Sequence, residues 1–267
     1  MESRSSAFPS FLVLLCLSAL LWACGNKTAP AGDDFSLTAT DTPTRTVKYE
    51  LHEDGVNSVV TAEAPGDCPW SRAVGEWLDE ALGGYYDGDP RDMQALVDTY
   101  GKAWADTLRA AVEEFEPEME VEYEATATKT YETDRIVTYT LEKYIGLGGA
   151  HPVSFSEGAT FRKSDGRRLG WDIFRRAMSW ELNEMIKKSL MAYFGTEDEE
   201  ELTNLTEIEN IYSIPLPKTP PFVLDNGLVF IYQQYEIAAY AYGMPNDTIA
   251  FGQIMPMLTH STQQLIQ

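Results

Sequence analysis

The sequence has few of the side chains that build disulfides, metal centres or nucleophilic active sites. It contains three cysteines and three histidines in 267 residues. Cys16 and Cys24 belong to the N-terminal segment, so only Cys68 remains for the folded part, which excludes an internal disulfide and a cysteine-based zinc site. No two histidines have metal-ligand spacing, and HExxH, GxSxG, CxxC and Walker-type motifs are absent. We therefore expect no metal, no cofactor and no enzymatic activity.

Basic residues are also scarce. The chain has 20 Lys and Arg against 42 Asp and Glu, a net charge of −22. Binding to phosphate backbones needs clustered Lys and Arg, so nucleic acid is excluded as an expected partner. An acidic surface attracts cationic partners and speeds their encounter. A role of the acidic residues in solubility alone would explain the same net charge. The charge by itself therefore does not distinguish partner binding from solubility.

The sequence also lacks a hydrophobic run long enough to span a bilayer. The apolar stretch from Phe11 to Trp22 has twelve residues, which is typical of a signal peptide. It ends in Leu-Trp-Ala-Cys, which resembles the lipobox of a bacterial lipoprotein with Cys24 as the acylated residue. We expect a signal peptide over residues 1–23 and a membrane anchor through lipid on Cys24. The alternative is an ordinary secretory signal with an incidental cysteine.

Residues 24–45 are rich in small and polar side chains and indicate a flexible tether. A lipid on Cys24 places the protein in the cell envelope. Gly25 gives no inner-membrane retention signal, so the outer membrane or the periplasmic face is expected. The remaining residues suffice for one large domain or two small ones.

Periodicity predicts helices followed by strands in the first part of the chain. Apolar residues recur at helical spacing over residues 69–82 and again from Asp89 to Phe115, with Asp89 as the expected cap. A period of two follows over residues 119–128, where glutamates alternate with apolar side chains. Residues 137–141 continue that pattern in an antiparallel partner. A weak strand is predicted over residues 47–61.

The second part of the chain shows strands, then a helix, then strands. The predicted elements are a strand over 153–161, a turn at 164–166, a helix over 179–194, a turn at 226–227, strands over 228–245 and 247–251, and a closing helix over 252–258. This order predicts an α+β fold with mainly antiparallel sheets and packed helices. We expect two consecutive α+β halves, residues 46–150 and 151–260.

The stretch LVFIYQQYEIAAYAYGMP, residues 228–245, is nearly uncharged and rich in tyrosine. Its hydrophobicity favours an interior strand over a contact surface, since exposure invites aggregation. Alternation breaks near Gln233 and Gln234, which predicts a bulge. Glu236 requires a hydrogen-bonding partner if it is buried. The end of the stretch, near Tyr242, is the better contact candidate.

Two passages resemble a known family. GLVFIYQQYEIAAYAYGMPNDTIAFGQI, residues 227–254, and YIGLGGAH, residues 144–151, are similar to segments of the extracellular domain of the anti-sigma factor RsiV. That segment also occurs outside the catalytic domain of the peptidoglycan deacetylase PdaC. Ala239 replaces a proline of the family pattern, and residues 144–151 hold two extra residues. The resemblance implies an RsiV-like domain over 151–260 and a PdaC-type N-terminal half over 46–150.

The resemblance implies recognition at the cell envelope, with a lysozyme-like protein or a peptidoglycan-related glycan as ligand. The candidate binding residues are Tyr144, His151, Tyr235, Glu236, Tyr240 and Tyr242. From the sequence around it alone, a structural role for His151 in the glycine-rich turn is favoured over a ligand contact. Two alternatives stay open: a cell-wall glycan hydrolase or modifying enzyme with Glu236 and His151 as acid and base, and a structural periplasmic protein.

Overall fold

The computed structural model describes residues 41–115 and 120–267. Its first two strands, β1 (Thr44–Glu53) and β2 (Val56–Pro65), form a hairpin. The turn residues Asp54 and Gly55 have φ angles of 48° and 78°. Two successive positive φ values are typical of the tightest hairpin turns. The prediction of a single weak strand over residues 47–61 is therefore wrong: that region is a complete hairpin.

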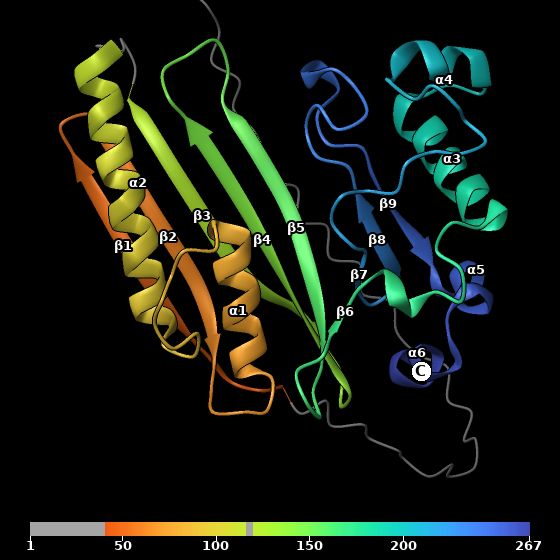
Figure 1. The fold of residues 1–267 in the computed structure, drawn as a ribbon, viewed down its shortest axis with the longest axis horizontal. Helices are drawn as coiled ribbons and strands as arrows, with labels where there is room; N and C mark the ends of the chain where they lie inside the picture. Colours follow the sequence, from red (N-terminus) through yellow and green to blue (C-terminus); the bar gives the residue numbers. More distant parts are fainter. Residues whose placement is uncertain (1–40, 116–119) are drawn as a thin grey trace, which may run out of the picture. The chain divides into compact units, whose positions relative to one another are not determined.

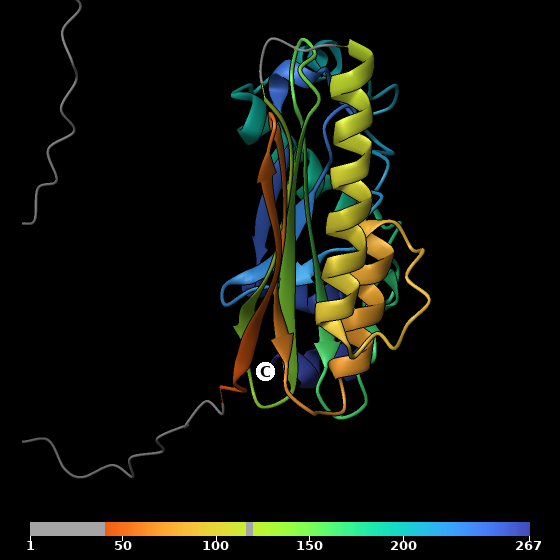
Figure 2. The ribbon, with the colours of Figure 1, turned by 90° about the vertical axis from the view of Figure 1, so that its left-hand side faces the viewer.

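Helices α1 (Ser71–Leu82) and α2 (Met93–Phe115) cover one face of the sheet, as Figures 1 and 2 show. Both were predicted, but α2 begins later than expected because the Asp92 carboxylate, rather than Asp89, accepts a hydrogen bond from Ala95 N (3.2 Å). Helix α2 approaches β1 closely at Gly101. A Cβ atom there would lie 2.1 Å from the Tyr49 ring, so only glycine permits this packing distance.

The larger sheet has the strand order β1-β2-β3-β4-β5-β6. Strands β2 and β3 are parallel, and α1 and α2 form the crossover between them. Its other neighbouring strands are antiparallel. The parallel pair was not predicted, because a β-helix-helix-β crossover and an α+β order share the same local periodicities. The remaining strands of this sheet are β3 (Val121–Glu132), β4 (Ile136–Gly146), β5 (Val153–Arg162) and β6 (Arg168–Leu169).

Strand β3 divides the sheet into a buried and an open face. Val121, Tyr123 and Ala125 are buried beneath the helices, while Glu122 and Glu124 alternate onto the opposite face. The acidic outer face predicted from the alternating glutamates is therefore confirmed. The core beneath the helices is rich in aromatic side chains, which are buried: Trp70, Trp77, Tyr100, Tyr123, Tyr139 and Phe161.

The C-terminal part of the chain builds a second core beside β5 (Figure 1). Its helix α3 (Trp180–Phe194) begins at Ser179, whose hydroxyl accepts from Leu182 N at 3.2 Å, as the sequence predicted. The other elements of this part are η1 (Trp171–Ile173), α4 (Glu199–Leu205), β7 (Phe222–Val223), β8 (Gly227–Ile231), η2 (Tyr240–Tyr242), β9 (Asn246–Ala250), α5 (Phe251–Ile254), η3 (Met255–Met257) and α6 (His260–Ile266).

The expected long strand over residues 228–245 is wrong. Strand β8 ends at Ile231, and the chain then turns through Tyr235, whose φ of 64° lies in the left-handed region. An extended strand has negative φ, so this residue interrupts it. Residues 227–232 are buried as predicted, whereas Tyr235 is 55% exposed. The closing helix over 252–258 is present as the short helices α5 and η3, and the further helix α6 was not predicted.

The α+β class with mainly antiparallel sheets is confirmed. The expected boundary between the two halves, residues 150 and 151, falls in the loop between β4 and β5, which pair from Ile145 and Val153 onward. The division into halves stays a prediction. Cys24, the predicted signal peptide over 1–23 and most of the predicted tether lie outside the described residues. Within the residues that are described, no helix is both long and apolar enough to cross a membrane.

Candidate functional site

Three of the predicted binding residues form an exposed aromatic cluster: His151, Tyr235 and Tyr240. The His151 imidazole stacks on the Tyr240 ring with centroids 3.8 Å apart and planes at 22°. The Tyr235 ring lies 5.7 Å from Tyr240, and its hydroxyl is 3.2 Å from His151 Nε2. The cluster brings the β4–β5 loop, with His151, onto the β8–β9 loop, which carries both tyrosines. Sequence positions 84 residues apart thus share one surface.

Hydrogen bonds fix the orientation of the His151 ring. Its Nδ1 lies 3.1 Å from the Pro152 carbonyl oxygen, which can only accept, so Nδ1 carries a proton. In the neutral imidazole this leaves Nε2 as the acceptor for the Tyr235 hydroxyl. The bond to backbone matches the structural role favoured from the sequence, but the ring is also part of an exposed aromatic surface. The geometry is therefore compatible with a structural role for His151 in the turn and with a ligand contact.

Tyr235 carries backbone strain at an exposed position. A left-handed conformation costs a non-glycine residue roughly 1–2 kcal/mol, because its Cβ crowds the following carbonyl. The φ of 64° at Tyr235 is one of two positive values among the described non-glycine residues. Strain of this kind concentrates at functional sites, where the surrounding structure maintains it. Here it turns the Tyr235 side chain outward rather than into the core.

Two glutamine side chains hold the strained loop against β5. The Gln233 amide accepts from Ser156 N (3.2 Å) and donates to Ser156 O (2.7 Å), as a neighbouring strand would. The Gln234 oxygen accepts from Ser154 N at 2.9 Å. These residues were missed as functional, although the break in alternation at this point was the sequence signal for them. They position Tyr235 beside His151.

Glu236 organises the same loop. One carboxylate oxygen accepts from Lys218 N (2.7 Å) and the other from Gln233 N (2.8 Å). Both oxygens therefore bind backbone, and no hydrogen bond joins Glu236 to His151 among the described residues. The hydrogen-bonding partners required for a buried acid are present, and they give Glu236 a positioning role rather than a place on the exposed surface.

The other two candidates, Tyr144 and Tyr242, make different contacts. Tyr144, on β4, has a raised pKa, first through partial burial and then through the nearby Glu122 carboxylate and Tyr240, which places it beside the cluster. Tyr242 belongs to a different contact: its ring meets Phe194 edge-on at 5.3 Å, and its carbonyl accepts from a tyrosine of α3. Tyr144 thus extends the aromatic cluster, and Tyr242 packs against the end of α3.

The aromatic cluster continues into the open face of the larger sheet. Along one cross-strand row, Glu124 is paired with Tyr144, and Tyr144 with Ser154, whose N–H is bound by Gln234. The neighbouring positions of the open face carry further acids. We call this surface the acidic face, and its members are Glu50, Glu122, Glu124 and Glu142.

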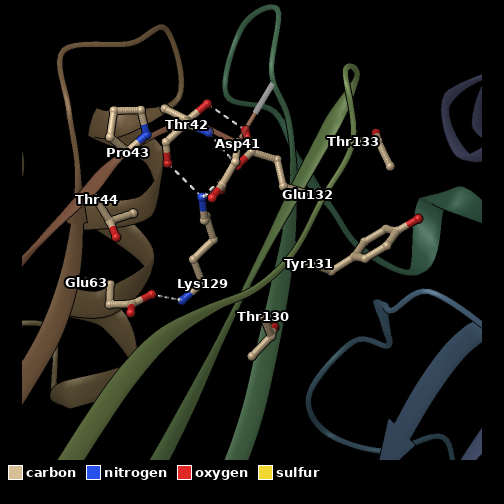
Figure 3. Close-up of a pocket in the computed structure, with 10 residues that line it drawn as sticks. All are labelled: Asp41, Thr42, Pro43, Thr44, Glu63, Lys129, Thr130, Tyr131, Glu132 and Thr133. Atoms are coloured by element: carbon tan, nitrogen blue, oxygen red, sulfur yellow. Dashed lines mark hydrogen bonds and ion pairs between the residues drawn. The ribbon is translucent and has the colours of Figure 1, made fainter. Parts of the chain in front are cut away.

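A hollow of about 450 Å³ lies at the end of β3 (Figure 3). Charged side chains that line it form ion pairs with one another. The Glu132 carboxylate accepts from Lys129 Nζ (2.8 Å), from Lys163 Nζ (2.5 Å) and from both N and Oγ1 of Thr42 (3.0 and 2.6 Å). Burial alone would raise its pKa, but these hydrogen bonds outweigh burial and lower the pKa to about 2. The network fixes the start of the folded chain to the sheet.

Comparison with known families identifies one domain. Residues 172–251 match the family described as a protein of unknown function (DUF3298). The match includes Tyr235, Glu236, Tyr240 and Tyr242, and it begins after strand β4, which carries Tyr144, and after the β4–β5 loop, which carries His151. No curated protein matches the chain.

Two solved structures share the fold. A DUF3298 family member from Bacteroides fragilis superposes with a TM-score of 0.65 and 16% sequence identity, covering 86% of this chain and 99% of that chain. A DUF3298 family protein from Pseudomonas aeruginosa gives a TM-score of 0.59 and 14% identity, covering 83% of this chain and 97% of that chain. At these identities the likeness concerns the fold, and it extends well beyond residues 172–251.

Proposed function

We propose that this chain, which carries a DUF3298 domain, is a non-enzymatic envelope lipoprotein that binds a cationic, lysozyme-like protein. The binding surface would be the aromatic cluster together with the acidic face. The observation that carries the proposal is the exposed, hydrogen-bonded stack of His151, Tyr235 and Tyr240, held in place by a strained backbone. Preorganised aromatic side chains supply a large contact area at little cost in conformational entropy.

Charge supports a cationic partner. The acidic face borders the aromatic cluster through the row of Glu124 and Tyr144, and the whole chain has a net charge of −22. Complementary potentials speed the encounter of two proteins and select against acidic competitors. A central aromatic anchor with a charged surround is the usual anatomy of a protein interface. The resemblance of residues 144–151 and 227–254 to the RsiV extracellular domain supports the same class of partner.

A peptidoglycan-related glycan is the second candidate ligand. The nearly parallel rings of His151 and Tyr240 offer an aromatic face of the kind on which sugar rings stack. The enzymatic alternative would require Glu236 to act as an acid or base, yet both its oxygens bind backbone N–H groups. Lipid on Cys24, outside the described residues, and a position at the outer membrane or periplasmic face complete the proposal.

Calorimetric titration of the purified protein with c-type lysozyme, at low and at high salt, tests the proposal. The informative variant is Tyr235→Gly, because glycine adopts the left-handed conformation without strain and leaves the loop intact. Truncating an interface anchor costs about 2 kcal/mol or more, so we expect at least a tenfold loss of affinity. The matched control is Tyr212→Ala, since Tyr212 is 66% exposed outside the cluster.

Each outcome separates the candidates. Binding that survives high salt and is lost in Tyr235→Gly but not in Tyr212→Ala supports specific recognition. Heat that disappears with salt in all three proteins means charge attraction alone and rejects the proposed interface. If lysozyme does not bind at either salt concentration while soluble wall fragments bind through Tyr235, the glycan replaces the protein as ligand.

A further inference from the structure

A second cleft lies on the helix-covered face of the larger sheet. It has a volume of about 280 Å³ and lies beside the C-terminal half of α1. One wall comes from α1, the floor from β5 and β6, and the opposite wall from the loop before β7. The lining residues that matter for its chemistry are Trp77, Glu80, Glu157, Arg168, Lys218 and Pro220.

The floor of the cleft holds a half-buried carboxylate that accepts no hydrogen bond from a described residue. The Glu157 side chain is 20% exposed, and no described residue donates a hydrogen bond to it. The nearest cation is Lys143, whose Nζ lies 3.8 Å from Glu157 Oε1. Lys143 Nζ donates instead to the Ala81 carbonyl at 2.5 Å, near the end of α1. Glu157 is therefore half-buried with one cation nearby and no protein hydrogen-bond donor in direct contact.

Burial perturbs both members of this pair. It raises the pKa of Glu157, and Lys143 compensates only in part. It lowers the pKa of Lys143, again against a smaller opposing effect of Glu157. An acid with a raised pKa beside a base with a lowered pKa marks a candidate binding site in a cleft. A charged or hydrogen-bonding ligand there would replace the water that the two side chains lost on burial.

Two basic side chains lie at the rim of the cleft, and only one of them forms an ion pair. Arg168 is paired with Glu80 across the mouth. Lys218 is exposed, and within the described residues its ammonium group forms no ion pair. The backbone of Lys218 is fixed, because its N–H donates to Glu236 at 2.7 Å. The cleft thus presents an unsatisfied carboxylate at its floor and an unpaired ammonium at its rim.

We propose that this cleft binds a free α-amino acid or a comparably small zwitterion. The ligand ammonium group donates to Glu157 at the floor, and the ligand carboxylate pairs with Lys218 at the rim. Trp77 and Pro220 supply apolar walls for a short side chain. The volume is slightly below the range typical of drug-sized ligands, as expected for a molecule of this size. The side chains proposed to contact this ligand do not belong to the aromatic cluster, although the Lys218 N–H donates to Glu236 of the neighbouring loop.

Nuclear magnetic resonance titration of the purified protein tests the site, with alanine as the zwitterion and with ethylamine and propionate as its two halves. Alanine should shift the amide resonances of Ala81 and Glu157 in a saturable way. Ethylamine should shift the same resonances more than propionate does. Glu157→Gln, which keeps the shape but loses the charge, should weaken alanine binding at least tenfold. Glu209→Gln, an exposed acid outside the cleft, is the matched control and should leave it unchanged.

The outcomes are decisive in both directions. The absence of any saturable shift with alanine overturns the proposal, as does equal alanine affinity in the wild type and Glu157→Gln. A larger response to propionate than to ethylamine overturns the assignment of the floor to an ammonium group. If Glu157→Gln does not fold, Lys218→Gln serves instead, because Lys218 is exposed: alanine affinity should fall about threefold, and an unchanged affinity counts against the site. Lysozyme binding plays no part in these measurements.

Discussion

Some single side chains stabilise this fold through contacts that their position in the sequence does not predict. Glu132 is the clearest case, since its side chain is only 8% exposed and binds two lysines and the N–H and hydroxyl of Thr42. Removing one member of a buried ion network leaves the others desolvated without a partner. At pH 7, Glu132→Gln should therefore lower the free energy of unfolding by about 3 kcal/mol. Urea denaturation followed by circular dichroism measures this loss.

The pH dependence of the same variant checks its cause. The pKa of Glu132 is about 2 in the folded protein against an ordinary value of 4.5. The lowered pKa stabilises the fold above pH 4.5, and this contribution is lost as the pH falls towards 2. The difference between wild type and Glu132→Gln should shrink over that range. The control Glu113→Gln, an exposed acid on α2, should show no such convergence. A constant difference at all pH values would contradict the ion-network explanation.

At the scale of elements, side chains substitute for a missing strand. Gln233 binds Ser156 N and Ser156 O from beyond the edge of β5, where the ladder with β6 does not reach. Gln233→Glu should keep the accepting oxygen but lose the donor to Ser156 O. An unsatisfied buried carbonyl costs about 1–3 kcal/mol, so we expect a destabilisation of that order. Hydrogen exchange of the Ser154 and Ser156 amides should become faster.

Gln253→Glu is the control for this prediction, because it introduces the same charge at an exposed position of α5. It should leave both the unfolding free energy and the exchange rates within experimental error. Equal effects of the two variants would indicate general charge repulsion in an acidic protein. Unchanged exchange at Ser154 and Ser156 in Gln233→Glu would show that the glutamine does not hold the edge of β5.

Helices and strands were predictable from the sequence where the hydrophobic periodicity was long and unambiguous. They were not predictable where tertiary contacts determine the backbone conformation or the strand pairing. The helical stripe of α2 and the alternation of β3 both follow from residue spacing alone. The stretch after Ile231 is as hydrophobic as a strand, but it leaves the sheet because Tyr235 adopts a left-handed conformation that hydrophobicity cannot report. The parallel pairing of β2 and β3 likewise depends on how α1 and α2 pack. Similarly, His151 and Tyr240 meet only in three dimensions.

At the scale of the whole molecule, one sheet connects features from both parts of the sequence. The register of β3, β4 and β5 places Glu124, Tyr144 and Ser154 in a single row that leads to the aromatic cluster. The helices cover the opposite face, so the acidic face is left free of them (Figure 2). In the function that we propose, charge on the open face attracts the partner at long range, and the aromatic cluster at its border makes the short-range contacts.

This separation predicts different kinetic effects from the two surfaces in binding to c-type lysozyme. Long-range attraction acts on association and is screened by salt, since the Debye length falls from about 30 Å at 0.01 M to about 8 Å at 0.15 M ionic strength. The association rate should therefore drop roughly tenfold or more over that range, with a dissociation rate that changes little. The triple variant Glu122→Gln, Glu124→Gln and Glu142→Gln should lower the association rate at low salt and flatten its salt dependence. Tyr235→Gly should instead raise the dissociation rate.

A second triple variant distinguishes the acidic face from overall charge. Glu113, Glu114 and Glu209 are exposed acids outside the acidic face, and their replacement by glutamine changes the net charge by the same amount. If association depends on the local field of the acidic face, this control should keep most of the salt dependence, because screening weakens distant charges more than near ones. An equal loss of association rate and salt dependence in both triple variants would mean that the net charge of −22 attracts the partner as a whole. The acidic face would then have no special role in association. Stopped-flow fluorescence resolves the two rates.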